Sequence, residues 1–153
     1  MFVQFIDSPL GAIKISASPL GISEILFSDT PGQNAPSPLT EQAAQQLQAY
    51  FNGSLRQFNL PLAACGTSFQ QQVWQALSAL PFGTTCSYAD IAGRIGNNKA
   101  VRAVGAANGR NPIAIVVPCH RVIGANGTLT GYAGGLDKKA WLLQHEQRQQ
   151  ALF

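Results

Sequence analysis

The sequence has few of the residues that several classes of protein require. Only 11% of its 153 residues are charged, and no apolar run approaches the roughly 20 residues needed to cross a membrane. Its three cysteines lack the paired spacing of a disulfide framework or a zinc site, and there are only two histidines. We therefore predict a protein with no metal, no cofactor and no membrane span.

The composition still suits a folded, globular protein. Hydrophobic residues make up 46% of the chain, which is enough to bury a core in one domain or two small ones. Residues Met1 to Gly11 include Asp7 and no basic residue, unlike a secretory signal. We expect a cytoplasmic protein, in which free thiols persist.

Charge is distributed unevenly along the chain. Residues 1–65 carry two basic and four acidic residues, a net charge of −2, whereas residues 66–153 carry eight and three, a net charge of +5. Between Ile91 and Leu136 there are five basic residues and no acidic one. A basic stretch is usually only a solvated surface, but it also suits an anionic partner such as a nucleic acid.

The pattern of residues 1–65 predicts a scaffold domain made of a small sheet and one helix. Three β-favouring runs, 2–6, 12–17 and 22–27, are separated by two Ser-Pro-Leu-Gly turns. A capping serine followed by Pro38 begins a helix that ends at Asn52-Gly53. No residue pattern in this domain indicates chemistry.

The second domain, residues 66–153, has a mostly helical pattern. Apolar residues recur at helical spacing from Phe69 to Leu80. Ser87 with Asp90 fits a capping box before a helix over residues 88–95, and a turn leads to a second helix from about residue 99 to 108. Two short helices joined by a tight turn indicate a helix-turn-helix, although many such pairs bind no DNA.

The second helix of this pair combines a core side with a side of small residues. Val101 and Val104 are expected to face the core. The other side carries one arginine among small residues: Arg102, Gly105, Ala106 and Gly109. Such a side allows close approach of a partner or close packing inside the protein, and the sequence leaves both open.

The five residues Pro118-Cys119-His120-Arg121-Val122 are the main chemical signal. They follow the apolar run 113–117, which we interpret as a buried strand. A thiol beside an imidazole can act as a nucleophile whose proton is taken by a neighbouring base. For Cys65 and Cys86 we expect only a packing or incidental role.

Three further segments complete the chain. Residues 122–124 and 128–130 flank Ala125-Asn126-Gly127, which predicts a hairpin wing. The small-residue loop 131–135 can approach a planar ligand closely. Residues 138–150 are predicted to form a helix with Trp141, Leu142 and His145 on one side.

Several separated motifs together resemble the O6-alkylguanine-DNA alkyltransferases, in particular the bacterial constitutive Ogt-type branch. The resemblance covers about residues 67–146 and rests on six segments: Ser87-Tyr88, Arg102-Ala103-Val104-Gly105, Asn111-Pro112, Pro118 to Val122, Gly131-Tyr132-Ala133-Gly134-Gly135 and Trp141 to Glu146. It implies an α+β fold, with a ribonuclease H-like sheet-and-helix domain followed by a winged helix-turn-helix domain. It also implies direct-reversal DNA repair.

The resemblance assigns chemical roles to five residues. Cys119 is the alkyl acceptor, activated by His120 through an ordered water, with Glu146 orienting the imidazole. From the helix pattern alone, Glu146 reads as a solvent-facing residue. Asn111 braces the cysteine turn, and Tyr88 donates a hydrogen bond to the guanine ring. The resulting thioether cannot be hydrolysed as a thioester can, so the protein is spent after one turnover.

The resemblance also implies how the substrate is bound. Arg102 enters the duplex in place of a flipped nucleotide, and the second helix lies in the minor groove through Ala103, Gly105, Ala106 and Gly109. The base pocket is formed by Tyr88, Val122, Tyr132, Ala133 and Gly134. We expect a monomer on double-stranded DNA, and leave open whether copies cooperate there.

Two departures from better-known relatives bear on specificity. Ala133 stands where some relatives have a serine hydroxyl, so only a backbone N–H is available there. We hypothesise a roomier pocket that accepts bulkier alkyl groups and O4-alkylthymine. Residues 1–65 also lack the Cys/His cluster that binds zinc in some relatives.

Three other functions compete with this interpretation. A cysteine hydrolase using Cys119, His120 and Glu146 would turn over repeatedly. An alkyltransferase-like damage sensor would lack the acceptor thiol, which is present. A transcription regulator would carry an additional sensor segment, and none is visible in residues 1–65.

Overall fold

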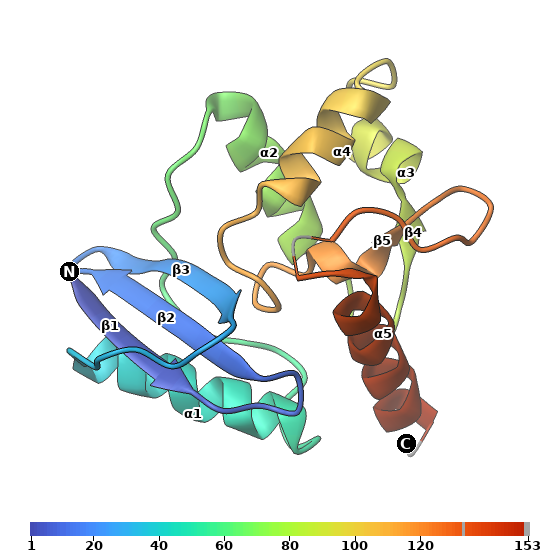
Figure 1. Cartoon of the computed structure of the whole chain (residues 1–153). Helices are drawn as coiled ribbons and strands as arrows, with labels where there is room; N and C mark the ends of the chain where they lie inside the picture. Colours follow the sequence, from blue (N-terminus) through green and yellow to red (C-terminus); the bar gives the residue numbers. More distant parts are fainter. Residues whose placement is uncertain (133, 152–153) are drawn as a thin grey trace. The chain divides into compact units, whose positions relative to one another are not determined.

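A computed structural model of the chain describes residues 1–132 and 134–151 (Figure 1). The chain divides into two compact units. Unit 1 contains Met1–Cys65 and the short segment Pro112–Ala114, and unit 2 contains Gly66–Asn111 and the chain from Ile115 onward.

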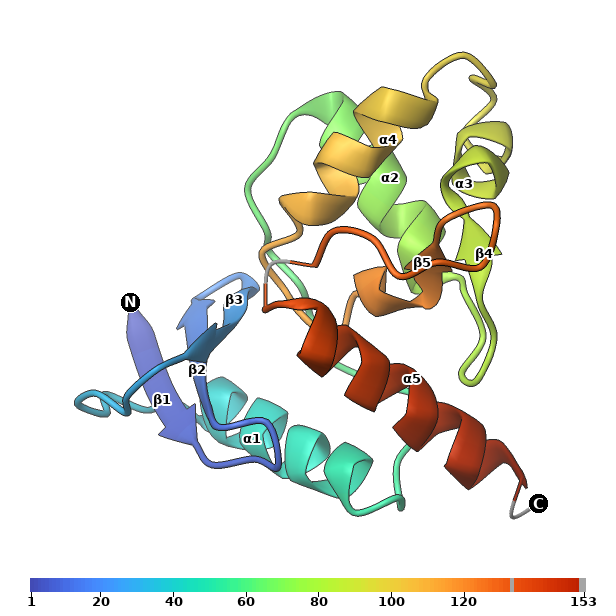
Figure 2. The same cartoon turned by 45° about the vertical axis from the view of Figure 1, so that its right-hand side comes forward.

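Unit 1 is a three-stranded antiparallel sheet with one helix along it, as the sequence predicts. The sheet has the order β1 (Phe2–Ile6), β2 (Ala12–Ser18), β3 (Gly21–Ser28), and α1 (Pro38–Phe51) lies against one of its faces (Figures 1 and 2). In the described residues of this unit, seven large side chains are almost fully buried: Ile13, Ile15, Ile22, Ile25, Leu47, Tyr50 and Ile113.

The start of α1 confirms the predicted cap. The Ser37 side chain accepts a hydrogen bond from the Thr40 N–H, the Thr40 side chain accepts one from the Ser37 N–H, and Pro38 stands at the first helical position. These contacts satisfy backbone donors that have no partner inside the helix. The helix therefore begins where its sequence places the cap.

The apolar run 113–117 is not the buried strand that we expected. Only Ile113 pairs, in a single parallel bridge to Ile25. The Ile25 N–H donates to the Pro112 carbonyl and the Ala114 N–H donates to the Ile25 carbonyl, at 2.9 Å each. Residues 114–116 form a turn, and Ile115 has a φ of 71°. An apolar run indicates burial, which is correct here, but it does not by itself distinguish a strand from a buried turn.

Unit 2 contains a three-helix group in which α2 (Ser68–Ser78), α3 (Tyr88–Arg94) and α4 (Val101–Gly109) pack together (Figure 2). The indole N–H of Trp74 donates to the Ala107 carbonyl at 2.9 Å and joins α2 to α4. Ser87 and Asp90 form the predicted capping box at the start of α3. The two short helices and the intervening turn confirm the predicted helical pair.

The remaining elements of unit 2 surround the cysteine motif. They are β4 (Cys86–Ser87), the 3-10 helix η1 (Cys119–Arg121), β5 (Val122–Ile123) and α5 (Leu136–Ala151). β5 pairs in parallel with β4, with Val122 opposite Cys86. The motif thus ends in a short strand that attaches it to the start of α3.

The predicted hairpin wing is only partly present. Its turn forms, because the Gly124 N–H donates to the Thr128 carbonyl at 2.9 Å. Residues 128–130, however, are not a strand. The Thr130 hydroxyl lies against Tyr88 and its carbonyl accepts from Lys139, so polar groups of this segment are bonded to helices instead.

In the described part of the chain, no helix combines the length and apolar character that a membrane span requires.

Candidate active site

Cys119 is the first residue of η1 and lies in a buried position. Its residue exposure is 6%, whereas Cys65 is exposed and Cys86 is half-buried. The Cys119 N–H donates to the Val117 carbonyl at 2.8 Å, and the same carbonyl accepts from the Asn111 side-chain amide at 2.8 Å. Asn111 therefore braces the tight turn that carries the thiol.

His120 and Arg121 both bind Glu146, which reaches them from α5. The His120 Nε2 lies 2.7 Å from the Glu146 Oε2. Arg121 donates from Nε to Oε1 at 2.8 Å and from a terminal nitrogen to Oε2 at 2.9 Å. Glu146 is fully buried, so its interpretation as a solvent-facing helix residue is wrong.

Arg121 connects this cluster to the end of α2. Its second terminal nitrogen donates to the Leu80 carbonyl at 2.7 Å, and the guanidinium lies 5.7 Å from the centre of the Phe82 ring. The Gly83 N–H adds a 3.3 Å bond to Glu146. A fully buried carboxylate thus has a complete set of donors, which is what keeps a buried charge tolerable.

The pKa values follow from this burial and pairing. Burial raises the pKa of Cys119, and a hydrogen bond from Asn111 and the charge of Lys139 partly oppose it. Burial lowers the pKa of His120. Burial alone would raise the pKa of Glu146, but its contacts with His120 and Arg121 reverse this and hold the pKa well below its usual range. At neutral pH the resting site is therefore a thiol, a neutral imidazole and a carboxylate.

The contact with Glu146 determines which nitrogen of His120 can act as a base. A carboxylate only accepts hydrogen bonds, so Nε2 carries the proton and Nδ1 carries the lone pair. Nδ1 is buried and has no hydrogen-bond partner among the described residues. It is therefore available to accept a proton.

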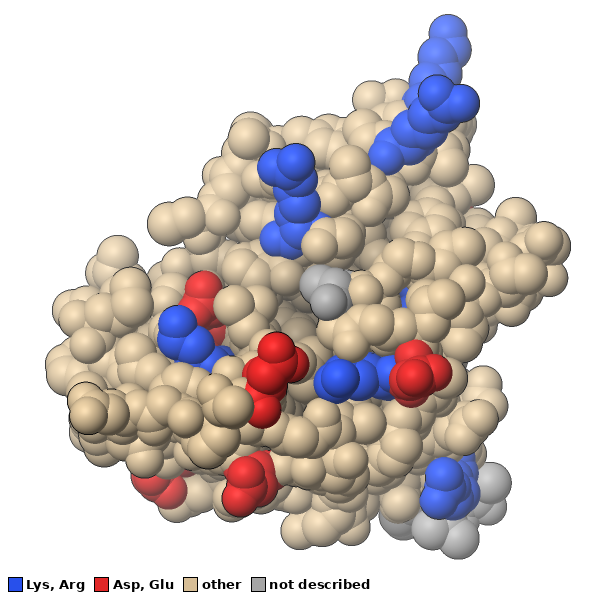
Figure 3. Space-filling model, viewed as in Figure 1, with Lys and Arg blue, Asp and Glu red and all other residues tan. Residues whose placement is uncertain are grey.

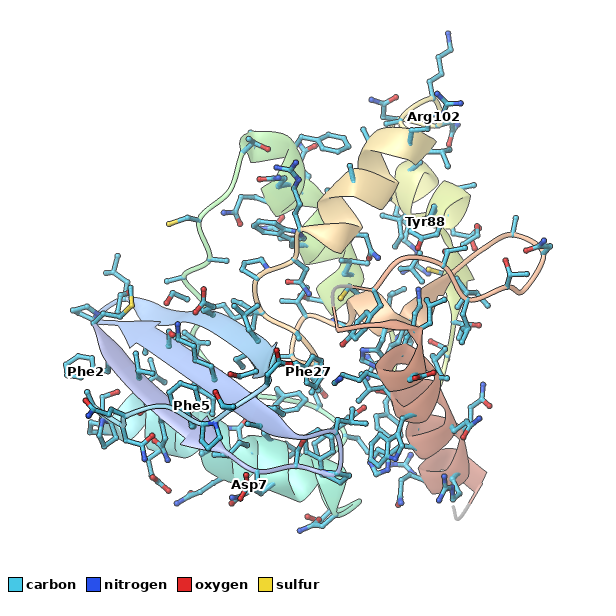
Figure 4. All side chains as sticks on the ribbon, in the orientation of Figure 1. Phe2, Phe5, Asp7, Phe27, Tyr88 and Arg102 are labelled. Carbon is cyan, nitrogen blue, oxygen red and sulfur yellow. The ribbon has the colours of Figure 1, made fainter. Side chains whose placement is uncertain are left out.

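The predicted base-pocket residues come from three segments of unit 2. Tyr88 begins α3 and its hydroxyl lies 2.9 Å from the Thr130 hydroxyl (Figure 4). Val122 is fully buried in β5. Burial raises the pKa of Tyr132 well above its usual value, and the negative charges of Cys119 and Glu146 add to this. Gly134 is half-buried, and Ala133 lies outside the described residues.

The small-residue side of α4 is open to solvent. Arg102, Ala103, Ala106 and Gly109 are exposed, and Gly105 is half-buried. A Cβ added at Gly109 would meet nothing within 4 Å, and one at Gly105 would only touch Tyr88 at 3.9 Å. Internal packing therefore does not require either glycine. Val104 is buried as expected, but Val101 is 37% exposed and does not face the core.

Exposed basic residues lie on α4 and next to both of its ends. Lys99, Arg102 and Arg110 are exposed there and Arg94 is exposed at the end of α3, while Arg121 is buried against Glu146 and adds nothing to the surface. In the view of Figure 3, basic side chains project over α4 and the preceding turn, and no acidic side chain lies beside them. Figure 4 shows Arg102 at the start of α4.

Two buried residues of unit 2, Lys139 and Asn108, make contacts that the sequence did not predict. Lys139 is fully buried, and its Nζ donates to the Thr130 carbonyl at 2.6 Å. Asn108 is 3% exposed and its amide lies 3.5 Å from the Cys119 carbonyl. Their helical positions predict only an exposed lysine and a polar helix end, because both partners are distant in sequence.

Among the described residues, no group of three potential metal ligands lies together.

Sequence and structure comparisons place these features in a known family. The chain matches the sequence model of the 6-O-methylguanine DNA methyltransferase ribonuclease-like domain over residues 1–64 and that of the DNA-binding domain over residues 68–148. This α+β protein with a buried Cys-His-Glu cluster is therefore a methyltransferase. The chain is a member of the 6-O-methylguanine DNA methyltransferase family.

Individual relatives match nearly the whole chain. It is 48% identical to a methylated-DNA–protein-cysteine methyltransferase of Methanosarcina acetivorans, covering 95% of this chain and 98% of the relative. A protein of the same name from Mycolicibacterium paratuberculosis is 47% identical, with 94% and 90% covered. The crystal structure of Mycobacterium tuberculosis OGT in complex with DNA has a TM-score of 0.89 at 45% identity, with 97% and 94% covered.

Proposed function

We propose that the protein repairs alkylated DNA by direct reversal, moving the alkyl group of O6-alkylguanine to Cys119 in a single turnover. The observation that carries the proposal is a buried thiol followed by a histidine whose Nε2 is held 2.7 Å from a buried glutamate, in a member of this family. The thiolate attacks the alkyl carbon, a C–S bond forms and the C–O6 bond breaks. The product is a thioether, so the acceptor is not regenerated.

His120 is the base that activates the thiol. The raised pKa of Cys119 keeps the resting thiol protonated, so the proton must be removed for attack. The lone pair on the His120 Nδ1 takes it through a bridging water, and Glu146 stabilises the resulting imidazolium. The Asn111 hydrogen bond and the nearby Lys139 charge favour the thiolate.

The base pocket consists of Tyr88, Val122, Tyr132, Ala133 and Gly134. Tyr88 donates to the ring of the leaving guanine, which carries away the electron pair of the broken bond. Tyr132, Ala133 and Gly134 are assigned by resemblance. A backbone N–H rather than a hydroxyl at Ala133 favours larger adducts, so transfer from O6-benzylguanine and O4-methylthymine is expected. Rejection of the benzyl adduct would contradict this assignment.

Helix α4 binds in the minor groove of duplex DNA. The open side of α4 and the exposed basic residues on it and next to its ends support this placement, since small residues let a helix approach the groove closely. Arg102 fills the place of the flipped nucleotide. Binding is by a monomer and depends mainly on backbone contacts, so it is sensitive to salt. Residues 1–65 serve as a scaffold and residues 66–153 as the DNA-binding and acceptor domain of a cytoplasmic protein.

Mass spectrometry after incubation with an O6-methylguanine oligonucleotide tests the chemistry. We expect one methyl group on Cys119, none in Cys119→Ser, and full transfer in Cys65→Ser and Cys86→Ser. Repair stops when one lesion has been removed per protein molecule. Multiple turnover with an unmodified thiol would instead indicate a hydrolase.

A second experiment separates base flipping from the chemistry. Arg102→Ala should slow transfer from duplex DNA by roughly tenfold or more, because unstacking a base costs a few kcal/mol. Transfer from the free nucleobase O6-benzylguanine should stay unchanged, because no duplex is opened. Lys14→Ala in unit 1 is the matched control. If Arg102→Ala slows transfer equally with both substrates, Arg102 does not act in base flipping.

A further inference from the structure

Thr130 joins two polar groups of unit 2, the Tyr88 hydroxyl and the Lys139 ammonium. Its hydroxyl lies 2.9 Å from the Tyr88 hydroxyl, and its carbonyl accepts from the Lys139 Nζ at 2.6 Å. Tyr88 comes from the start of α3 and Lys139 from α5. The chain is thus bonded to both helices at a single residue, directly before the glycine loop.

The two contacts divide the polar atoms of Thr130 between the two partners. The Tyr88 hydroxyl lies 3.5 Å from the Thr130 carbonyl, which is at the outer limit of a hydrogen bond, whereas the Lys139 ammonium is at 2.6 Å. A charged donor makes the shorter and stronger bond. The carbonyl therefore belongs to Lys139, and the Thr130 hydroxyl is the partner of Tyr88.

A bond between two hydroxyl groups can run in either direction, and the direction matters here. When Tyr88 donates to Thr130, its single proton is occupied. When Thr130 donates to Tyr88, the phenolic proton is free for another acceptor. A phenol oxygen that accepts a hydrogen bond is also a better donor, because bonds in a chain polarise one another.

We propose that Thr130 is a positioning residue for Tyr88: with the base bound, its hydroxyl donates to the Tyr88 oxygen and directs the phenolic proton to the leaving guanine. This inference rests on the proposed function, in which Tyr88 donates to the purine ring. Thr130 itself does not touch the reacting atoms. It acts by orienting Tyr88 and by stabilising the negative charge that develops on the phenol oxygen.

A double-mutant cycle tests the proposal through single-turnover transfer from an O6-methylguanine duplex at saturating protein. Thr130→Val keeps the β-branched shape and leaves the backbone carbonyl for Lys139, but it removes the hydroxyl. We expect transfer about tenfold slower, the effect of one lost hydrogen bond. Thr130→Ser restores the hydroxyl and should restore the rate.

The second half of the cycle uses Tyr88→Phe. If Thr130 acts through the Tyr88 hydroxyl, adding Thr130→Val to Tyr88→Phe slows transfer no further. Additive slowing, or a Thr130→Ser variant as slow as Thr130→Val, overturns the proposal. Thermal melts and DNA affinity of all variants should match the wild type, so that a folding or binding defect is not counted as slower transfer.

The same experiment separates this inference from the proposed function. Absence of methylation of Cys119 in the wild-type protein would refute the function itself. If Cys119 is methylated but the effects of Thr130→Val and Tyr88→Phe are additive, the proposed function stands and only the role of Thr130 is refuted.

Discussion

The two units of the molecule bury very different kinds of side chain. In the described residues of unit 1, the buried polar side chains are Ser16 and Thr40, and neither is charged. Within the described part of unit 2, seven polar or charged side chains are buried: Asn108, Asn111, His120, Arg121, Lys139, His145 and Glu146. Five of these lie on η1 or α5.

This difference separates a unit that is stabilised mainly by apolar burial from a unit that buries charged groups next to the thiol. Apolar burial stabilises unit 1 at about 25 cal/mol per Å² without requiring specific partners. A buried charge is tolerated only when it is paired, and the pair often contributes little net stability. The cluster around Glu146 is therefore a condition for positioning the thiol rather than a general source of stability.

The largest expected effect comes from breaking this cluster. Glu146→Gln leaves the Arg121 guanidinium buried without a counter-charge, so we expect the free energy of unfolding to fall by about 3–5 kcal/mol. Leu47→Ala in unit 1 should cost a similar amount, about 2–5 kcal/mol, through the cavity it leaves. Urea denaturation followed by circular dichroism measures both values.

Activity distinguishes the two substitutions even where stability does not. At a temperature at which both variants remain folded, Glu146→Gln should transfer alkyl groups slowly and Leu47→Ala at the wild-type rate. Slow transfer by Leu47→Ala under those conditions would contradict the division between a scaffold and a chemical unit.

The pH dependence of stability should also reflect unit 2. The folded-state pKa values of His120 and Glu146 are both lowered, whereas the unfolded chain titrates these groups near about 6.5 and 4.3. The unfolded state therefore binds more protons as the pH falls, and stability is lost below about pH 6.5 and further below about pH 4.3. Unfolding free energies at pH 7.5, 5.5 and 4 test this, and Glu146→Gln should lack the more acidic step.

The smallest effect is expected at the surface of unit 1. Lys14 and Glu24 form an ion pair at 3.4 Å with both side chains more than a third exposed. Exposed pairs contribute about 0–1 kcal/mol, so Glu24→Gln should change the unfolding free energy by less than about 1 kcal/mol. A larger loss, insensitive to added salt, would show that unit 1 also depends on charge.

Local signals in the sequence predicted the elements better than the contacts between them. The caps at Ser37 and Ser87 and the meander of β1 to β3 could be predicted because turn and cap residues act on their own neighbours. The same reasoning failed at residues 113–117, where burial came from a turn, and at Val101, which is exposed. Periodicity indicates an apolar side but not what covers it.

The cluster around Cys119 lay largely beyond sequence reasoning without the family resemblance. Glu146 binds residues 25 and 26 positions earlier, and Lys139 reaches Thr130 from another element. Nothing in the α5 pattern distinguishes these two side chains from solvated ones. Their burial results from the packing of α5 against η1, which no local pattern specifies.

Helix α4 sets a fixed distance between its exposed arginine and the backbone of the cysteine motif. Arg102 is at its exposed start, and six residues later Asn108 contacts the Cys119 carbonyl. At 1.5 Å per residue these positions are about 9 Å apart along the helix axis. Because a helix resists stretching, α4 keeps its exposed arginine at a fixed axial distance from the residue that contacts the Cys119 backbone.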